Sequence, residues 1–262
     1  MMGTVVGGRY RLDERVGRGS LGDVWRCVDQ QLGRTVAVKL LVAHERLAQR
    51  IHLGWTRVME KVDHHGVVHI YDSGLDPAVG LYVAMEYVQG EVLPEVLARQ
   101  GRLPPARTMD LVAQVADALH ALHGLGVVHG GLRPGRILVR PDGTVVLSAF
   151  GLDHQLGQPN VAMALGNARY LAPEQAMGGI PRIGSDVFCL GVVAYECLSG
   201  RPPFEADHQL EVAMRVIREA PPPLPPDVPP GIRSIVERAM AKDPGDRWPT
   251  AAALATAARS AS

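Results

Sequence analysis

The chain has 262 residues, of which 47% are hydrophobic and 21% are charged. This composition can build one large core or two smaller lobes, so it excludes a chain that is disordered throughout. Lys and Arg number 27, as do Asp and Glu, and the net charge of zero excludes a global basic field for nucleic acid or anionic lipid.

The cysteine pattern and the apolar runs bear on the compartment. Cys27, Cys189 and Cys197 form no CxxC pair, which indicates reduced thiols in a cytosolic protein. Residues 1–11 contain no signal-peptide core, and the longest apolar run, 187–198, is too short to span a bilayer. We therefore expect a cytoplasmic protein without a membrane span. Arginine far outnumbers lysine, which indicates the GC-rich coding of a high-GC bacterium.

The first part of the chain is predicted to be rich in β-structure. Alternating patterns predict strands at 10–16, 23–28 and 35–42, then a helix over 43–62 and strands at 67–71 and 81–87. A glycine segment, Gly17-x-Gly19-x-x-Gly22, joins the first two strands. Because a strand and not a helix follows it, the segment does not fit a dinucleotide-binding turn, but its N–H groups could lie over phosphates. An ordinary glycine-rich hairpin is the alternative.

From residue 91 the pattern becomes helical. Helices are predicted over 108–123, 185–198, 211–218, 232–242 and 250–259, with short strands at 127–128, 137–139 and 145–147. The order predicts an α+β protein with a small β-rich lobe, a larger α-helical lobe and a cleft between them. We expect an N-terminal extension (1–9), an N-lobe (10–87), a C-lobe (88–258) and a tail (259–262).

Two further motifs each allow two interpretations. The proline-rich stretch Pro221–Pro230 could bind an SH3-like groove, but a stiff exposed loop between two helices is favoured. The pair His64–His65 could ligate a metal, but the pattern lacks further ligands at a suitable spacing, so a turn before a strand is favoured.

A lysine on the third predicted strand strengthens the interpretation of the glycine segment as a phosphate-binding loop. Lys39 ends the run Val36-Ala-Val-Lys39, seventeen residues after Gly22. A strand lysine facing a glycine loop can pair with phosphate oxygens, although a surface lysine is the plainer alternative. Together with Ala172-Pro-Glu174, Ser185-Asp-Val187 and Asp243-Pro-Gly-Asp-Arg247, in this order, these motifs resemble the bacterial form of the eukaryotic-like Ser/Thr protein kinase domain. The resemblance covers residues 10–258 and implies the bilobal protein-kinase fold.

The resemblance also implies site residues. It makes Met85 the gatekeeper and Glu86–Val88 the hinge of an ATP cleft. It implies a spine of Met59, Ile70, His129 and Phe150, a loop held by Asp186, and a Glu174–Arg247 pair. The implied candidates for the ATP cleft are Val16, Gly17, Gly19, Gly22, Val24, Ala37, Lys39, Met85, Glu86, Val88 and Leu138.

The chain departs from the family at four positions that carry chemistry. Gly131 stands where the family has the aspartate that accepts the substrate proton. Arg136 and Ala149 stand where the family has its two metal ligands, and Trp55 replaces the glutamate that pairs with the lysine. Between Ala149 and Glu174 there is no Ser or Thr, so loop phosphorylation is not expected. These positions are therefore degenerate, with no catalytic or metal residue predicted.

These departures lead to the hypothesis that the chain is not an enzyme but a pseudokinase, acting as a binding or allosteric signalling module. The alternatives are an atypical active Ser/Thr protein kinase and an ATP-occupancy sensor. The sequence leaves ATP binding open: Lys39 and Arg136 would make it weak and metal-independent, with no Mg²⁺, whereas Trp55 or Arg136 filling the phosphate site would prevent it. A protein partner, either a signalling protein or another kinase, is expected.

Overall fold

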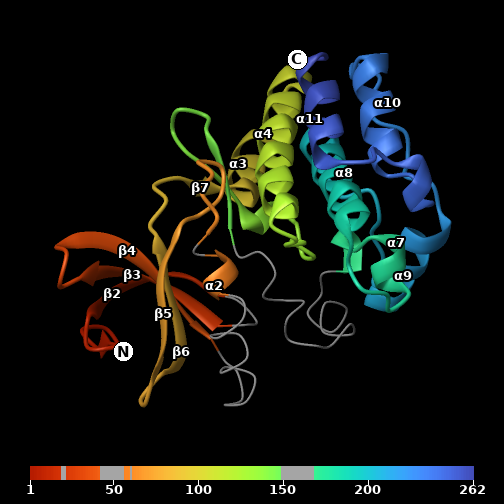
Figure 1. The fold of residues 1–262 in the computed structure, drawn as a ribbon. Helices are drawn as coiled ribbons and strands as arrows, with labels where there is room; N and C mark the ends of the chain where they lie inside the picture. Colours follow the sequence, from red (N-terminus) through yellow and green to blue (C-terminus); the bar gives the residue numbers. More distant parts are fainter. Residues whose placement is uncertain (19–21, 42–55, 60, 149–167) are drawn as a thin grey trace. The chain divides into compact units, whose positions relative to one another are not determined.

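In the computed structural model the chain divides into two compact units, Met1–Gln89 and Gly90–Ser262 (Figure 1). The structure describes all residues except 19–21, 42–55, 60 and 149–167. A six-stranded sheet makes up most of the first unit, and helices dominate the second. The predicted α+β class is therefore confirmed.

The sheet of the first unit is antiparallel throughout, with strand order β1-β2-β3-β4-β6-β5. Its register pairs Val5 with Arg11 at one edge, so the residues before Tyr10 belong to the sheet. The elements are β1 (Val5–Val6), β2 (Tyr10–Gly17), β3 (Gly22–Asp29), β4 (Arg34–Leu41), α2 (Thr56–Met59), β5 (Ile70–Asp76) and β6 (Gly80–Glu86).

Two predictions for this unit differ from the structure in part. Most of the helix predicted over 43–62 lies outside the described residues, and of its described part Thr56–Met59 is helical whereas residues 61–62 are not. The strand predicted at 67–71 is displaced, because β5 begins at Ile70 and continues to Asp76. The cause is a turn: Gly66 N donates to His64 Nδ1 at 3.0 Å, and Val67 N donates to the carbonyl of His64. His64 and His65 therefore form the favoured turn, and the described residues contain no cluster of three or more metal-ligand side chains.

One face of this sheet forms the core of the first unit. Strands alternate their side chains, so every second residue of β4 points to this face together with its partners on β3 and β6. Burying them supplies most of the stabilisation of the sheet. The core residues are Val6, Tyr10, Leu12, Trp25, Cys27, Val36, Val38, Leu40, Tyr82 and Ala84.

The second unit consists of helices and a small sheet, β7-β8-β9. Short 3₁₀ turns occur at 134–136, 168–170 and 244–246. Its other elements are β7 (Glu91–Val92), α3 (Leu93–Gln100), α4 (Pro105–Gly124), β8 (Ile137–Val139), β9 (Val145–Leu147), α7 (Pro173–Ala176), α8 (Ile183–Ser199), α9 (Gln209–Arg218), α10 (Pro230–Ala239) and α11 (Ala251–Arg259).

Helix α8 lies at the centre of this unit. Its residues are almost all apolar and buried, and α4, α10 and α11 pack against it (Figure 1). The strand predicted at 127–128 does not form, because Val127 N donates to the carbonyl of Leu122 and closes the end of α4. No helix in the described part of the chain has both the length and the apolar character to cross a bilayer.

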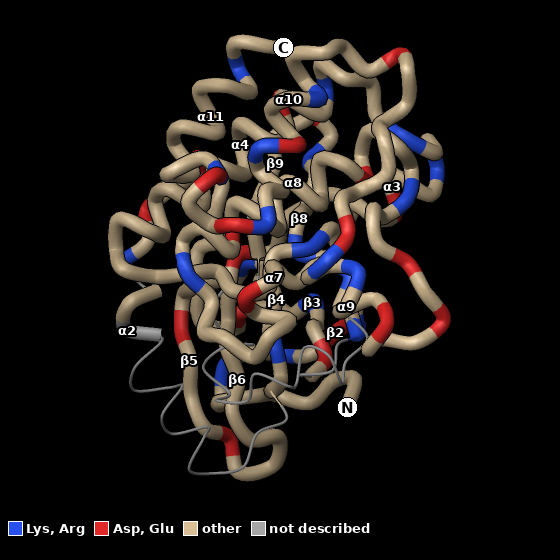
Figure 2. The backbone as a smooth tube through the Cα atoms, turned by 90° about the vertical axis from the view of Figure 1, so that its right-hand side faces the viewer, with Lys and Arg blue, Asp and Glu red and all other residues tan. Residues whose placement is uncertain are grey.

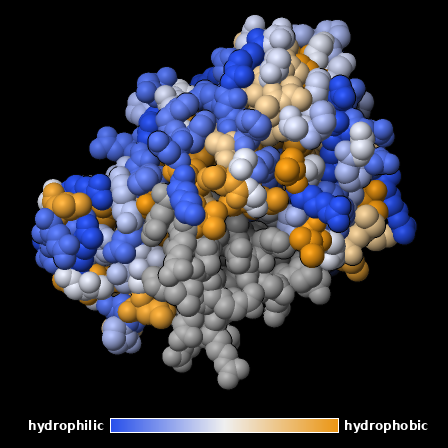
Figure 3. Space-filling view, viewed as in Figure 1, coloured by the Kyte–Doolittle hydropathy of each residue, from blue (hydrophilic) through white to orange (hydrophobic). Residues whose placement is uncertain are grey.

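The proline-rich stretch forms an exposed loop between α9 and α10, as favoured. Arg233 of α10 orders this loop by donating to the carbonyl oxygens of Pro225, Pro226 and Val228. Basic and acidic residues are interspersed along both units (Figure 2). On the face shown in Figure 3, apolar side chains of the helical unit lie in small groups among hydrophilic ones, which is ordinary for a folded surface.

Candidate functional site

In the first unit, one face of the sheet brings together several of the predicted ATP-site residues. Val24 of β3 lies opposite Lys39 of β4, and Ala37 lies opposite Met85 of β6. Directly paired residues of antiparallel strands point to the same face, as do residues two apart on one strand. Val24, Ala37, Lys39 and Met85 therefore share the face opposite the hydrophobic core, while Gly17 pairs with Val24 at its edge.

Lys39 is the most informative of these residues because it is a buried cation. Only 4% of it is exposed, although lysine is rarely buried without compensating interactions. Its neighbours across the sheet are Val24 and Val83. The plainer alternative of a surface lysine is thus wrong, and the burial indicates a positioned charge.

The predicted hinge leaves the sheet at the end of β6. Glu86 N donates to the carbonyl of His69 at 2.8 Å, and Glu86 is half-buried. Val88 is 9% exposed, whereas Val16 on β2 is 45% exposed and is not part of the buried set. The structure thus gives Val16 a more open position than its neighbour Val24.

Gly22 begins β3 at a position that only glycine fits. Its φ is +127°, and a Cβ added there would lie 1.7 Å from the carbonyl oxygen of Leu40. The backbone of the glycine segment therefore approaches β4 as closely as sterics allow, beside the strand that carries Lys39. Gly19 lies outside the described residues.

Replacing Gly22 by alanine is expected to destabilise the first unit by about 2 kcal/mol or more, because the methyl group meets backbone and the φ is unfavourable. The matched control is Gly33→Ala, which has a φ of +63° but nothing within 4 Å of the added Cβ. Gly33→Ala should lower the free energy of unfolding only by the strain of a left-handed backbone conformation, about 1 kcal/mol. Urea unfolding of both variants measures the difference, and equal losses would contradict the close approach.

In the second unit, a buried carboxylate holds the loop at residues 129–136. Asp186 at the start of α8 accepts hydrogen bonds from His129 N and Gly130 N, both at 2.8 Å. The ring Nε2 of His123 lies 2.8 Å from the same carboxylate, which is fully buried. Two backbone donors and one imidazole fix this loop, which confirms the expected role of Asp186.

The loop itself carries basic side chains and no carboxylate. Gly130 has a φ of +69°, and its carbonyl accepts from Gln175 Nε2 at 2.9 Å. Gly131 N donates to His129 Nδ1 at 3.2 Å. Arg133 and Arg136 are half-buried at its end, and Leu138 follows, half-buried, on β8. The loop is therefore rigid and cationic, and residue 131 has no side chain with which to accept a proton.

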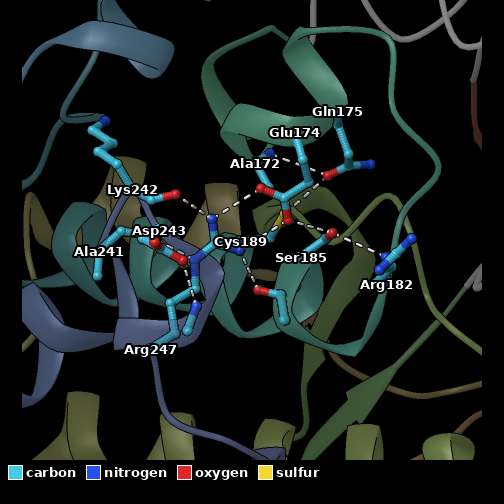
Figure 4. Close-up of polar contacts among 12 residues, drawn as sticks. Ala172, Glu174, Gln175, Arg182, Ser185, Cys189, Ala241, Lys242, Asp243 and Arg247 are labelled. Carbon is cyan, nitrogen blue, oxygen red and sulfur yellow. Dashed lines mark hydrogen bonds and ion pairs between the residues drawn. The ribbon is translucent and has the colours of Figure 1, made fainter.

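A second polar cluster ties α7 to Arg247, which precedes α11 (Figure 4). Arg247 donates to both carboxylate oxygens of Glu174 at 2.9 Å, which confirms the expected pair. Ser185 Oγ donates to Glu174 Oε1 at 2.6 Å. Burial opposes ionisation of Glu174, but these donors outweigh it and hold the pKa of the carboxyl below its ordinary value.

Some predicted positions cannot be placed, and some contacts were not predicted. Trp55, Ala149 and the spine residue Phe150 lie outside the described residues, while Met59, Ile70 and His129 are buried. Sequence reasoning missed His123 and Gln175, which respectively support Asp186 and the carbonyl of Gly130. Their signal was weak, since a lone histidine at a helix end and a lone glutamine are both common on surfaces.

Comparison with known proteins gives one family and several relatives. A family model described as "Protein kinase domain" matches residues 10–257. The chain is 40% identical over 258 residues to serine/threonine-protein kinase PknA of Mycobacterium tuberculosis, covering 94% of the chain and 60% of that protein. It is 34% identical to PknA of Corynebacterium glutamicum, over 97% and 56%, and 34% identical to PknB of Mycolicibacterium smegmatis, over 94% and 42%. The chain thus spans about 60% or less of the length of these relatives.

Proposed function

The chain belongs to the protein kinase family, and from that premise we propose that it is an atypical Ser/Thr protein kinase that transfers the γ-phosphate of ATP to protein hydroxyl groups. The observation that carries the proposal is Lys39, buried on one sheet face with Val24, Ala37 and Met85. The relatives support it, because the three named above are Ser/Thr protein kinases.

Two predictions from the sequence are corrected by these relatives. The prediction that the chain is not an enzyme is overturned, because proteins 34–40% identical over 94–97% of the chain are named as Ser/Thr protein kinases. The prediction of metal-independent ATP binding without Mg²⁺ falls with it, because protein kinases use ATP with Mg²⁺.

The residues of the first unit fit a nucleotide. Val24 and Ala37 offer a small apolar surface for an adenine ring, and Met85 borders it on β6. Gly22 itself places no side chain beside β4, the strand that carries Lys39. Lys39 would neutralise phosphate oxygens with a charge that the sheet already positions.

The fit to a protein-held magnesium ion is different. Arg136 and Ala149 occupy the positions at which the family coordinates metal, and neither side chain is a magnesium ligand. We therefore expect Mg²⁺ to enter with the nucleotide, held by phosphate oxygens and water, and not by these two side chains.

The remaining steps fall to this chain's own residues. Phosphoryl transfer depends mostly on positioning and on neutralising charge, whereas the general base contributes roughly 10²–10⁴ in rate. Asp186 keeps the loop backbone in place, and Arg133 and Arg136 supply permanent positive charge near its end. Gly131 accepts no proton, so the substrate hydroxyl would lose its proton to water or to a phosphate oxygen. Slow transfer is the expected result.

The test measures phosphate transfer from Mg·ATP to the chain itself and to a basic protein, with detection of phosphoserine and phosphothreonine by mass spectrometry. Transfer is expected in the wild type, and Lys39→Met should reduce it about 10²-fold or more because a positioned phosphate-binding charge is lost. Lys61→Met is the matched control, since Lys61 is an exposed lysine of the same unit. Absence of transfer, or transfer independent of Lys39, would contradict the proposal.

A second candidate function is ATP-occupancy sensing, in which bound nucleotide changes the affinity for a signalling protein or another kinase. The side-chain-free position at Gly131 favours it, because residue 131 offers no proton acceptor to drive rapid turnover. Nucleotide binding that alters partner affinity while no phosphate is transferred would favour this function over the first. Signalling through a protein partner and a cytoplasmic location stay predictions.

A further inference from the structure

A cavity in the helical unit, remote in sequence from the loop at 129–136, has no role in the proposed chemistry. Residues 220–224 of the proline-rich loop form one wall, and Tyr195 of α8, Val236 of α10 and Met240 just after α10 form most of the rest. The volume of the cavity is about 380 Å³. Since an apolar cavity of about 150 Å³ can hold benzene, this one has room for a molecule with two rings.

The walls of the cavity are held in place by the fold. The apolar side chains of Leu224, Val236 and Met240 are buried in the helical unit. Arg233 of α10 ties the loop down directly after residue 224, through its three hydrogen bonds to loop carbonyls. The prolines at 221–223 each have a fixed φ, which stiffens their wall. The cavity is therefore preformed, and binding would not have to order its walls.

The interior of the cavity offers no charge to a ligand. Lys242 belongs to the lining, but its Nζ donates to the carbonyl of Val216 at 2.5 Å and lies 4.3 Å from the ring centroid of Phe204. Neither of these partners lines the cavity, so the ammonium is satisfied outside it. Glu237 is the carboxylate of the lining, and it is exposed at the rim. A charged ligand would lose its hydration without gaining a partner, which favours a neutral one.

One polar group in the lining lacks a partner. Tyr195 is 3% exposed, and in the described part of the chain its hydroxyl makes no hydrogen bond, although buried tyrosines usually find a partner. The hydroxyl is not one of the partnerless polar atoms that are sealed from solvent, so the opening that reaches it is the cavity. Burial raises the pKa of this phenol, so it stays protonated at neutral pH and can donate. An unsatisfied donor in an apolar cavity calls for an acceptor on the ligand.

We propose that this cavity binds a neutral two-ring aromatic molecule whose carbonyl oxygen accepts a hydrogen bond from the Tyr195 hydroxyl. The lining favours aromatic rings, because the thioether of Met240 and the ring of Tyr195 both make favourable contacts with them. The proline wall adds apolar surface that the ligand would cover. The site is separate from the proposed phosphate transfer and does not depend on it.

The experiment titrates the intact protein with 1-indanone, a neutral two-ring molecule with one carbonyl group. Two related probes serve as controls: indane lacks the carbonyl, and indane-1-carboxylate carries a charge. The methyl NMR signal of Met240 reports binding in the cavity. We expect 1-indanone to shift this signal with a Kd of about 1 mM or below, as suits a molecule of its size. Indane should bind about three- to tenfold more weakly, and the carboxylate more weakly still.

Two variants separate the hydroxyl from the cavity. Tyr195→Phe should weaken 1-indanone about three- to tenfold and leave the affinity for indane unchanged. Its urea midpoint should stay near that of the wild type, because the hydroxyl has no protein partner to lose. Ala220→Trp places a large side chain at the exposed rim and should weaken both probes.

Four outcomes would each overturn the proposal. They are a Met240 signal that 1-indanone does not shift, equal affinities of the wild type for 1-indanone and indane, unchanged 1-indanone affinity in Tyr195→Phe, and unchanged affinity for both probes in Ala220→Trp. A clearly lower urea midpoint for Tyr195→Phe would also count against it, because the hydroxyl would then serve the fold and not a ligand.

Discussion

Replacing Gly131 by aspartate is expected to raise the rate of phosphoryl transfer by roughly 10²–10⁴, the contribution of a positioned general base. The aspartate would place a proton acceptor where the family has one. The loop is ready to hold it, because Asp186 fixes the backbone of His129 and Gly130 immediately before. Of the two glycines at 130 and 131, only Gly130 has a positive φ. Residue 131 can therefore carry a side chain without left-handed strain.

The matched control for this variant is Gly131→Asn, which has the same shape as aspartate but cannot act as a base at neutral pH. It should leave the rate near that of the wild type. The comparison uses initial rates of phosphate transfer from Mg·ATP to one protein substrate. Each rate is divided by the concentration of folded protein in the sample. If the aspartate and asparagine variants transfer phosphate at the same rate, residue 131 does not face the reacting hydroxyl.

The sequence predicts the fold well where a period is long or repeated. The alternation along β2, β3 and β4 places their core face correctly, and the apolar run of α8 is indeed the buried central helix. It fails where a short contact overrides the pattern. The turn at His64 delays β5 by three residues, and a backbone hydrogen bond from Val127 replaces a strand with a helix end. Neither contact produces a periodic pattern of apolar residues from which it could be predicted.

The site residues also fall into a predicted group and a group that the sequence did not predict. The position of Lys39 on a strand and the pairing of Glu174 with Arg247 follow from the motifs on which the resemblance rests, whereas the burial of Lys39 is seen only in the structure. The support from His123 and Gln175 could not be predicted, because neither residue belongs to one of the motifs on which the resemblance rests. The inference of inactivity treated four positions as the whole of catalysis. Positioning and charge neutralisation also contribute, and side chains that act as a unit do not lose their contributions additively.

Arg247 is expected to be a major determinant of the stability of the helical unit. It is 1% exposed, and all five of its N–H donors are used. Two go to Glu174, and the others go to the carbonyl oxygens of Gly184, Ala241 and Lys242. Arg247→Met removes these donors and leaves a largely buried carboxylate without its cation. A loss of about 3–5 kcal/mol in the free energy of unfolding is expected at pH 7.

The pH dependence identifies the cause of that loss. In the wild type the pKa of Glu174 is below its ordinary value, so the pair's contribution is complete above the ordinary glutamate pKa and is lost as pH falls through the folded value. In Arg247→Met the hydrogen bond from Ser185 to Glu174 remains, but burial, the largest influence on this carboxyl, is no longer offset by the guanidinium and favours the protonated form. The deficit between the two proteins should therefore be largest near pH 7 and shrink in acid, as urea unfolding at both pH values can measure.

A matched pair of variants tests whether the effect belongs to the buried arrangement. Arg215→Met removes an exposed arginine that pairs with Glu211 on α9, and solvent screening should leave the urea midpoint almost unchanged. Glu174→Gln in the Arg247→Met background should restore part of the lost stability, since it removes the unpaired charge while keeping the shape. If Arg247→Met is as stable as Arg215→Met, the five donors of Arg247 contribute nothing that water cannot replace.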